Sequence, residues 1–119
     1  MIFAKNADAS PLRVKSVEGK AMAGSLLIRP LIQGEQMSLM ETRVLAGVVA
    51  PPHAHDHESL IYVVHGLLKT VIGDESFVLG PGDACRHPSN VSHYIEALAD
   101  SIFVEVKAPA PDLTRLYSM

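Results

Sequence analysis

The sequence predicts an all-β protein folded as a single antiparallel β-barrel or sandwich. Short runs rich in Val, Ile, Leu, Thr and Phe recur along the chain, each bounded by Gly, Pro, Asp or Asn. Helical periodicity is weak throughout. The 119 residues, 48% apolar and 19% charged, have the composition of an ordinary globular protein and suffice for one core. We therefore expect one domain.

Seven runs are the predicted strands. They cover residues 24–32, 37–47, 59–66, 67–73, 75–80, 92–98 and 101–107. Gly73 and Asp74 separate two of these runs, and both residues readily supply the positive φ that a tight hairpin loop needs. Pro81 and Gly82 mark a turn, and the "HPSN" of residues 87–90 marks another. These turns indicate that the strands are antiparallel neighbours.

The two ends of the chain are predicted to lie outside the barrel. Residues 1–11 form an N-terminal arm, residues 12–110 the barrel, and residues 111–119 a C-terminal tail. Prolines exclude regular structure up to Pro111, after which one short helical turn is possible.

Charge and cysteine content exclude several classes of protein. The formal net charge is -3, with acidic and basic residues interspersed, so no basic stripe is present and nucleic acid is not an expected partner. The single cysteine, Cys85, cannot form an internal disulfide, and the N-terminus lacks the apolar stretch of a secretory signal. No apolar run approaches the length of a membrane span. A cytoplasmic location without membrane contact is expected.

The stretch "HAHDHES", residues 53–59, predicts a metal site. Alternate residues of a strand share a face, so the imidazoles of His53 and His55 can converge on one ion. His93 is the best third ligand, because it follows two turns and begins a strand that could lie alongside the histidine strand. Three neutral imidazoles with open coordination positions suit zinc, iron, nickel, cobalt or manganese. A divalent metal ion is the expected cofactor.

Other polar residues near these histidines are candidates for the same site. His57 shares strand parity with His53 and is a further possible ligand or pocket residue. His87, next to Pro88, is predicted to face the cavity beside the ligands. Glu58 is a candidate for proton transfer at the rim.

Two separated motifs resemble those of the cupins. The first runs from Gly47 to Gly66 and contains His53, His55 and Ser59; the second contains Pro81-Gly82-Asp83, Pro88 and His93. Cupins are small antiparallel barrels of the jelly-roll type, so the resemblance implies that fold and a metal ion inside it. It also implies a homodimer.

The resemblance implies a ligand set as well. Cupins hold their metal with two His and a Glu or Gln from the first motif and one His from the second. The implied ligands are therefore His53, His55 and His93, with Ser59 at the carboxylate or amide position. Ser59, His57 or water is left to fill the fourth position.

From about residue 26 to 112 the chain is similar to the pectin-degradation cupins of the KdgF type. The similar stretches are "HAHDHES", "IYVVHG", "LGPGD", "PSNVSH" and "EALADSIFVEVKAPAPD". Members of that group help open the ring of unsaturated uronate sugars with an Asp, an aromatic residue and an Arg, whose positions here are Glu105, Lys107 and Pro111. Glu105 is thus the implied proton-transfer residue, with a pKa that burial would raise toward working pH. Lys107 or Arg115 would have to pair with a substrate carboxylate.

Taken together, these observations predict a metal-dependent enzyme of carbohydrate metabolism that acts on a small polar carbonyl or sugar-acid substrate. The ion would polarise an oxygen while Glu105 or Glu58 moves protons. Two alternatives stay open: a three-His Fe(II) dioxygenase, and a non-catalytic cupin that binds or senses a small ligand.

Overall fold

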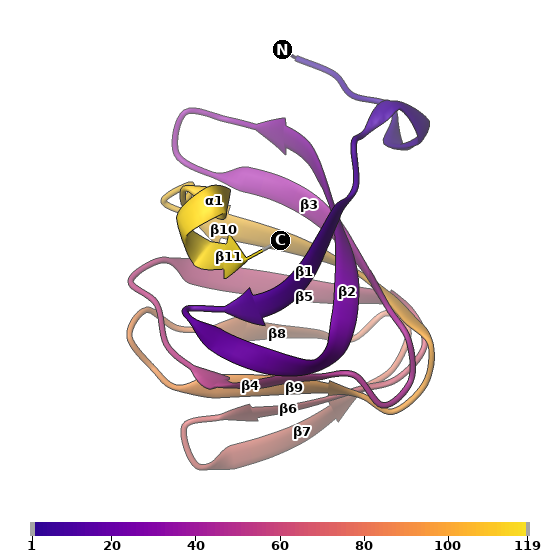
Figure 1. Cartoon of the computed structure of the whole chain (residues 1–119), viewed down its shortest axis with the longest axis vertical. Coiled ribbons are helices and arrows are strands. Elements are labelled where there is room, and N and C mark those ends of the chain that lie inside the picture. Colours follow the sequence, from indigo (N-terminus) through magenta and orange to yellow (C-terminus); the bar gives the residue numbers. More distant parts are fainter. Residues whose placement is uncertain (1, 119) are drawn as a thin grey trace.

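A computed structural model describes residues 2–118 and shows two antiparallel sheets that curve into a nearly closed barrel (Figure 1). The strands are β1 (Leu12–Val17), β2 (Lys20–Gln33), β3 (Ser38–Val44), β4 (Val49–His53), β5 (Glu58–His65), β6 (Leu68–Ile72), β7 (Glu75–Leu79), β8 (Ala84–His87), β9 (His93–Ala97), β10 (Ser101–Ala108) and β11 (Tyr117–Ser118). The helical elements are a 3-10 turn, Asn6–Asp8, and α1 (Leu113–Leu116). The predicted all-β jelly-roll barrel is confirmed.

The long strand β2 belongs to both sheets. One sheet has the order β1-β2-β3-β10-β5-β8, and the other has the order β2-β4-β9-β6-β7. Ala23 of β2 pairs with Val49 of β4, whereas the part of β2 from Leu26 onward pairs with β3. Gly24 lies between these two parts with a φ of 86°, a conformation that L side chains rarely adopt. It allows the strand to pass from one sheet to the other.

Side chains that alternate along the strands fill the interior. In β10, for example, Ser101, Phe103, Glu105 and Lys107 are buried while the residues between them are partly exposed. Two apolar clusters form the core. One contains Val14, Val17, Ile28, Met40, Ala50 and Leu116, and the other contains Val44, Ile61, Val63, Leu68, Leu79, Ala97 and Phe103. Buried polar side chains lie between them, so the barrel interior is not uniformly apolar.

Most predicted strands and turns agree with the structure, but three strands were not predicted. Gly73 and Asp74 form the loop between β6 and β7, and Gly82 adopts a φ of 89° in the turn before β8. The sequence did not predict β1, β4 or β8 as separate strands. None of the helices within residues 2–118 is long and apolar enough to cross a bilayer.

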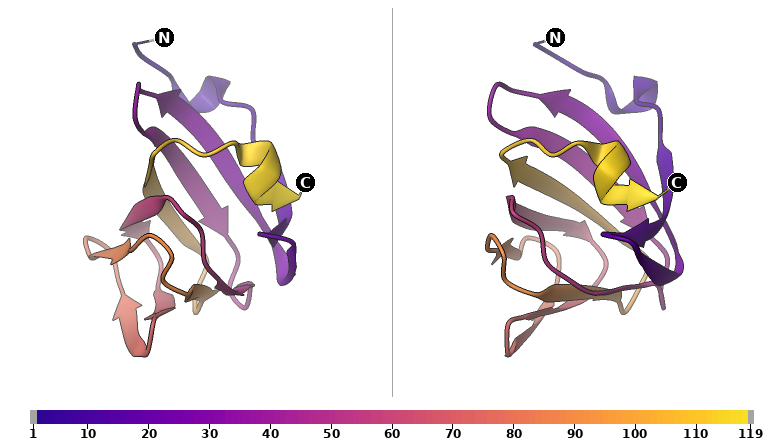
Figure 2. Two further views of the ribbon diagram at one scale, coloured as in Figure 1. Left: turned by 90° about the vertical axis from the view of Figure 1, so that its left-hand side faces the viewer. Right: turned by 60° about the vertical axis from the view of Figure 1, so that its left-hand side comes forward.

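The ends of the chain contact the barrel more closely than the expected arm and tail. Asn6 donates a hydrogen bond to Glu41 and accepts one from Arg29. The predicted helical turn after Pro111 is present as α1, and β11 then pairs with β1 (Figures 1 and 2). Leu116 packs into the first apolar cluster. Residues 1 and 119, the outermost of the arm and the tail, lie outside the described part.

Candidate metal centre

Three histidines from the two predicted motifs meet inside the barrel. His53, the last residue of β4, pairs directly with His93, the first residue of β9, and His55 follows two residues later. All three side chains are buried. Each offers one ligand nitrogen, and these nitrogens lie within 4.8 Å of one another. The predicted three-His cluster is therefore present.

A hydrogen bond to the backbone fixes the tautomer of each ring. The Nδ1 atoms of His53, His55 and His93 lie 2.7, 3.1 and 3.1 Å from backbone carbonyl oxygens. A carbonyl oxygen can only accept, so each Nδ1 carries the proton and donates it. The three Nε2 atoms are then left with bare lone pairs, which is the form in which imidazole binds a metal.

Burial keeps these rings neutral. Desolvation, with a smaller contribution from the charge of Lys107, lowers the pKa of His55 to about 4. Desolvation and the neighbouring His87 lower the pKa of His93 to about 3, and desolvation also lowers the pKa of His53. Protons therefore compete weakly for the three Nε2 lone pairs at neutral pH.

The size of the cluster fits a divalent ion. For nitrogens within 4.8 Å of one another, a point in their plane lies about 2.8 Å or less from all three, compared with the Zn–N distance of about 2.0–2.1 Å in proteins. Small shifts of the rings would close this difference. Three neutral nitrogens do not select among zinc, iron, nickel, cobalt and manganese.

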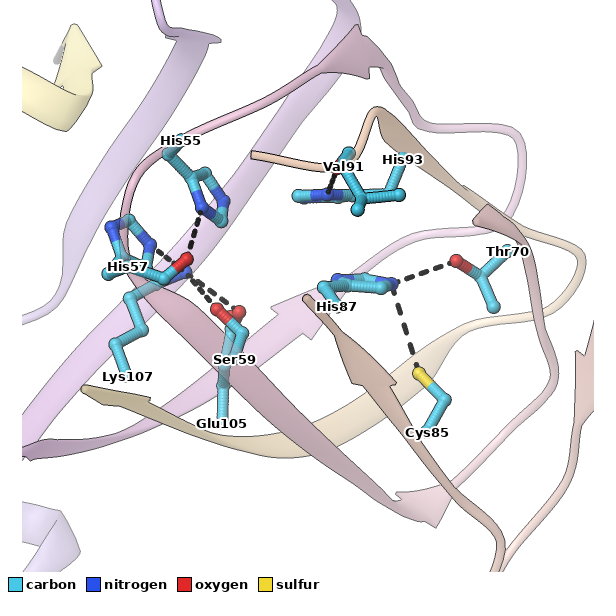
Figure 3. A network of polar contacts seen from close by, with 10 residues as sticks. All are labelled: His55, His57, Ser59, Thr70, Cys85, His87, Val91, His93, Glu105 and Lys107. Carbon is cyan, nitrogen blue, oxygen red and sulfur yellow. Dashed lines mark hydrogen bonds and ion pairs between the residues drawn. The ribbon is translucent and has the colours of Figure 1, made fainter. Parts of the chain in front are cut away.

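A buried lysine holds the polar residues next to the cluster. Lys107, 2% exposed, donates from Nζ to Glu105 Oε2 at 2.8 Å, to Ser59 Oγ at 3.1 Å and to His57 Nε2 at 3.3 Å (Figure 3). An ammonium group has three protons, and these three acceptors match them. The predicted pocket residues His57 and Lys107 are thus in contact with each other.

This arrangement bears on the fourth ligand position. The Nε2 lone pair of His57 points at Lys107, and the ring stacks on His55 with centroids 3.7 Å apart. Ser59 shares its oxygen with the same ammonium, and a metal ion at that oxygen would be repelled by the positive charge. Ser59 as a ligand stays a prediction that the geometry disfavours. The described residues offer three protein ligands and leave the other coordination positions open.

Glu105 lies inside the barrel as expected, but its pKa shifts in the opposite direction from the expectation. Burial alone would raise the pKa of Glu105, as the sequence analysis assumed. The charge of Lys107 and its hydrogen bond outweigh burial and hold the pKa below its usual value. Glu105 is therefore a carboxylate at neutral pH, able to accept a proton or to stabilise positive charge.

Glu58 is not brought to the cavity. It is the first residue of β5 and points to the outer face, where its carboxylate lies 3.4 Å from Arg86 Nη1. Both side chains are largely exposed. The predicted catalytic role of Glu58 therefore has no support from its position.

The cluster opens toward one end of the barrel. An inner cavity of about 40 Å³ is lined by the three ligand histidines, His87, Glu105 and Lys107 together with apolar side chains. This volume holds an ion and a few waters. A mouth of about 420 Å³ lies outside it, between the loop of residues 54–57 and residues 111–116. His55 lines both spaces, so the mouth leads to the cluster.

The mouth carries charged side chains that the motifs do not contain. Its lining includes Glu18, Asp56, Asp112 and Arg115. Only Arg115 was considered from the sequence. Its place beside the histidines depends on α1, which brings residues distant in the chain to this end of the barrel.

Two threonines of the interior were missed by the sequence analysis. Thr70 lies 2.9 Å from the Nε2 atom of His87, and Thr42 lines the inner cavity. His87 itself is buried, as predicted, with its ring stacked on His93 at 4.0 Å between centroids. The inward parity of Thr70 with Leu68 in β6 was the signal that could have identified it.

A small jelly-roll barrel with a buried, open three-histidine cluster defines a class of metal-binding proteins. Residues 40–106, more than half of the chain, match the family described as the cupin domain. The chain belongs to the cupin family. A search among curated proteins found no significant match.

Solved structures of cupins are similar over nearly the whole chain. KdgF from Halomonas sp. has a TM-score of 0.82 and 24% sequence identity, covering 96% of this chain and 98% of that one. A predicted oxalate decarboxylase from Thermotoga maritima has a TM-score of 0.79, 19% identity and coverages of 92% and 99%. The polyketide cyclase RemF from Streptomyces resistomycificus has a TM-score of 0.72, 24% identity and coverages of 91% and 79%. These similarities establish the fold.

Proposed function

We propose that this protein is a metal-dependent enzyme acting on a small polar substrate that contains a carbonyl group or an acidic sugar. The observation that carries the proposal is the set of three neutral imidazoles, each with its Nε2 lone pair bare, at the inner end of an open mouth. His53, His55 and His93 would hold the ion. When bound, the ion supplies a Lewis acid that polarises a substrate oxygen.

The other residues of the site have distinct parts in this proposal. Glu105, ionised and buried beside the cluster, accepts a proton from the substrate or stabilises positive charge. Lys107 keeps that carboxylate charged and fixes its orientation through the 2.8 Å hydrogen bond. Arg115 lines the mouth with a cation that can bind a substrate carboxylate.

The sharpest version of the proposal is ring opening of unsaturated uronates, supported by the similarity to KdgF from Halomonas sp.. The test is turnover of an unsaturated uronate by protein loaded with each of the five candidate metals. We expect turnover that is lost in His55→Ala. We expect Arg115→Gln to raise KM more than it lowers kcat, because Arg115 lies in the mouth and not in the inner cavity. Absence of turnover with every metal rejects this version.

One observation favours a second candidate function. Lys107 engages Ser59 and His57, so the ion would have only three protein ligands and would keep positions for both oxygen and substrate. This is the arrangement that a three-His Fe(II) dioxygenase needs. Oxygen consumption by the Fe(II)-loaded protein with diketones or thiols tests it. If Glu105→Gln alters no reaction of any substrate tried, the non-catalytic ligand-binding function is favoured instead.

We further propose that the protein acts in the cytoplasm as a homodimer. The outer face of β5 carries three large apolar side chains, Leu60, Tyr62 and Val64, each about half exposed. A second copy that covers this face would remove them from water. Cys85 is unpaired and only partly buried, which suits a reducing compartment.

A further inference from the structure

One ring nitrogen of the inner cavity has no partner. His87 ends β8, is 1% exposed and lines the cavity with the three ligand histidines. Among the residues that the structure describes, its Nδ1 atom meets no hydrogen-bond partner. Figure 3 shows contacts from the other ring nitrogen to Thr70 and Cys85. An unpaired polar atom this deeply buried indicates that something not belonging to the chain fills the position beside it.

The hydrogen bonds of Thr70 determine which nitrogen of His87 carries the proton. Thr70 Oγ1 lies 2.9 Å from the carbonyl oxygen of Tyr94 and 2.9 Å from His87 Nε2. A carbonyl oxygen only accepts, so the single hydroxyl proton of Thr70 goes to Tyr94. Thr70 must then accept from His87, and the proton of the neutral ring is on Nε2. The opposite tautomer would place two lone pairs against each other at 2.9 Å.

It follows that Nδ1 of His87 is a hydrogen-bond acceptor, and that the group missing beside it is a donor. A second unpaired atom on the same cavity supports this conclusion. Thr42 Oγ1 also lines the cavity, is 1% exposed and is without a hydrogen-bond partner within residues 2–118. The cavity of about 40 Å³ has room for water beside an ion.

His87 is close to the three-His cluster but is not a member of it. Its ring stacks on that of His93 with an angle of 13° between the planes. The group of ligand nitrogens within 4.8 Å of one another contains His53, His55 and His93, and His87 is not among them. Its position is one layer outside the ligands.

We propose that His87 Nδ1 accepts a hydrogen bond from a water molecule that the ion of the three-His cluster binds on its open side. Thr70 is the positioning residue that holds His87 in the required tautomer. This inference rests on the metal site of the proposed function. It assigns the orientation of the water to a residue outside the ligand set.

The test is nuclear magnetic resonance of the histidine side chains, with long-range proton–nitrogen correlation spectra that report the protonation of each ring nitrogen. The protein is measured without metal and with one equivalent of zinc, which is diamagnetic. We expect His87 to be protonated at Nε2 in both states. With zinc we expect large nitrogen shifts for the three ligand histidines and a smaller shift for Nδ1 of His87.

Each outcome of the titration has a distinct meaning. If the three ligand histidines do not respond to zinc, the metal site itself is refuted. If they respond while Nδ1 of His87 does not, the inference about His87 is overturned. It is also overturned if His87 carries its proton on Nδ1, or if its Nδ1 shift is as large as those of the ligands.

Substitutions of Thr70 test the positioning role. Thr70→Val removes the acceptor of the Nε2 proton with little change of volume, so we expect His87 to populate the Nδ1-protonated tautomer. Thr70→Ser keeps the hydroxyl and should restore the original tautomer. An unchanged tautomer in Thr70→Val refutes the role of Thr70.

Zinc affinity, measured by competition with a chelator, provides a second readout. We expect His87→Leu to weaken zinc binding about tenfold, as the loss of a partner outside the ligand shell commonly does. The matched control is His65→Leu, an exposed histidine at the end of β5, which should bind zinc as the unchanged protein does. Equal affinities of the two variants contradict the proposal.

Discussion

Replacement of Lys107 by methionine removes one member of a buried ion pair and keeps most of the side-chain volume. Lys107 and Glu105 are 2% and 9% exposed in their side chains, and their charged atoms lie 2.8 Å apart. The variant leaves the carboxylate of Glu105 buried without a counter-charge. Removal of one partner of such a pair costs about 3–5 kcal/mol of folding free energy.

The expected effect on the melting temperature follows from the length of the chain. At about 2.1 cal/mol/K per residue, unfolding of 119 residues has an entropy near 0.25 kcal/mol/K, so 1 kcal/mol corresponds to about 4 °C. Lys107→Met should therefore melt roughly 12–20 °C below the unchanged protein at pH 7.

The sign of the pH dependence can also be worked out. In the unchanged protein the pKa of Glu105 is lowered, so its ion pair contributes stability above the unfolded pKa of about 4.3. That contribution is lost as the pH falls through the folded pKa. In Lys107→Met the pKa of Glu105 is raised by burial, because a neutral carboxyl group is cheaper to bury. The difference in stability between the two proteins should shrink as the pH falls toward 4.

A double-mutant cycle measured by urea denaturation separates this cause from a loss of packing. In Lys107→Met/Glu105→Leu no buried charge is left unpaired, and we expect its stability to be within about 2 kcal/mol of the unchanged protein. If Lys107→Met alone costs less than about 1 kcal/mol, or if the two single substitutions simply add, the ion pair does not have the role assigned to it.

Three further predictions concern pH, backbone strain and assembly. Because the pKa values of His55 and His93 are lowered to about 4 and 3, the metal-free protein should lose stability as the pH falls from 6.5 toward 4, where only the unfolded chain takes up protons; zinc affinity should change little from pH 7 to 5. Gly66→Ala should cost more folding free energy than Gly47→Ala, by about 1–3 kcal/mol in denaturant titrations: both have positive φ, but only at Gly66 would a Cβ collide with the loop before β10. Tyr62→Lys should convert the proposed dimer to a monomer in analytical ultracentrifugation, and a monomeric unchanged protein would exclude the dimer.

The sequence predicted the barrel and its ligands because their signals are local. Gly73-Asp74 and Pro81-Gly82 mark turns by backbone conformation, which depends little on the rest of the fold. His53 and His93 were placed together because each begins or ends a strand at a fixed distance from such a turn. The ligand histidines were therefore within reach of pattern analysis.

The unpredicted strands have physical reasons for being obscure. In β4, Pro51 and Pro52 argue against a central strand, since proline has no N–H to donate. The structure accommodates them because the register with β9 is irregular between Ala50 and His53. In β8 only four residues separate two turns, too few for a period to be visible.

The partners of Lys107 were beyond prediction for a different reason. Its candidacy as a pocket residue came from the sequence, but its three acceptors come from β5, β10 and the loop between β4 and β5. Only the assembled barrel brings them within 3.3 Å of one atom. The lowered pKa of Glu105 depends on that assembly, which is why burial alone gave the wrong direction.

Because His53 and His93 face each other across β4 and β9, zinc uptake reports on correct strand pairing. A slip of one residue between these strands would turn the His93 ring out of the interior and leave two nitrogens, too few to retain the ion. Chains that mispair would thus be distinguishable from native ones by their inability to take up metal. Added zinc would draw a mixed population toward the native register during refolding.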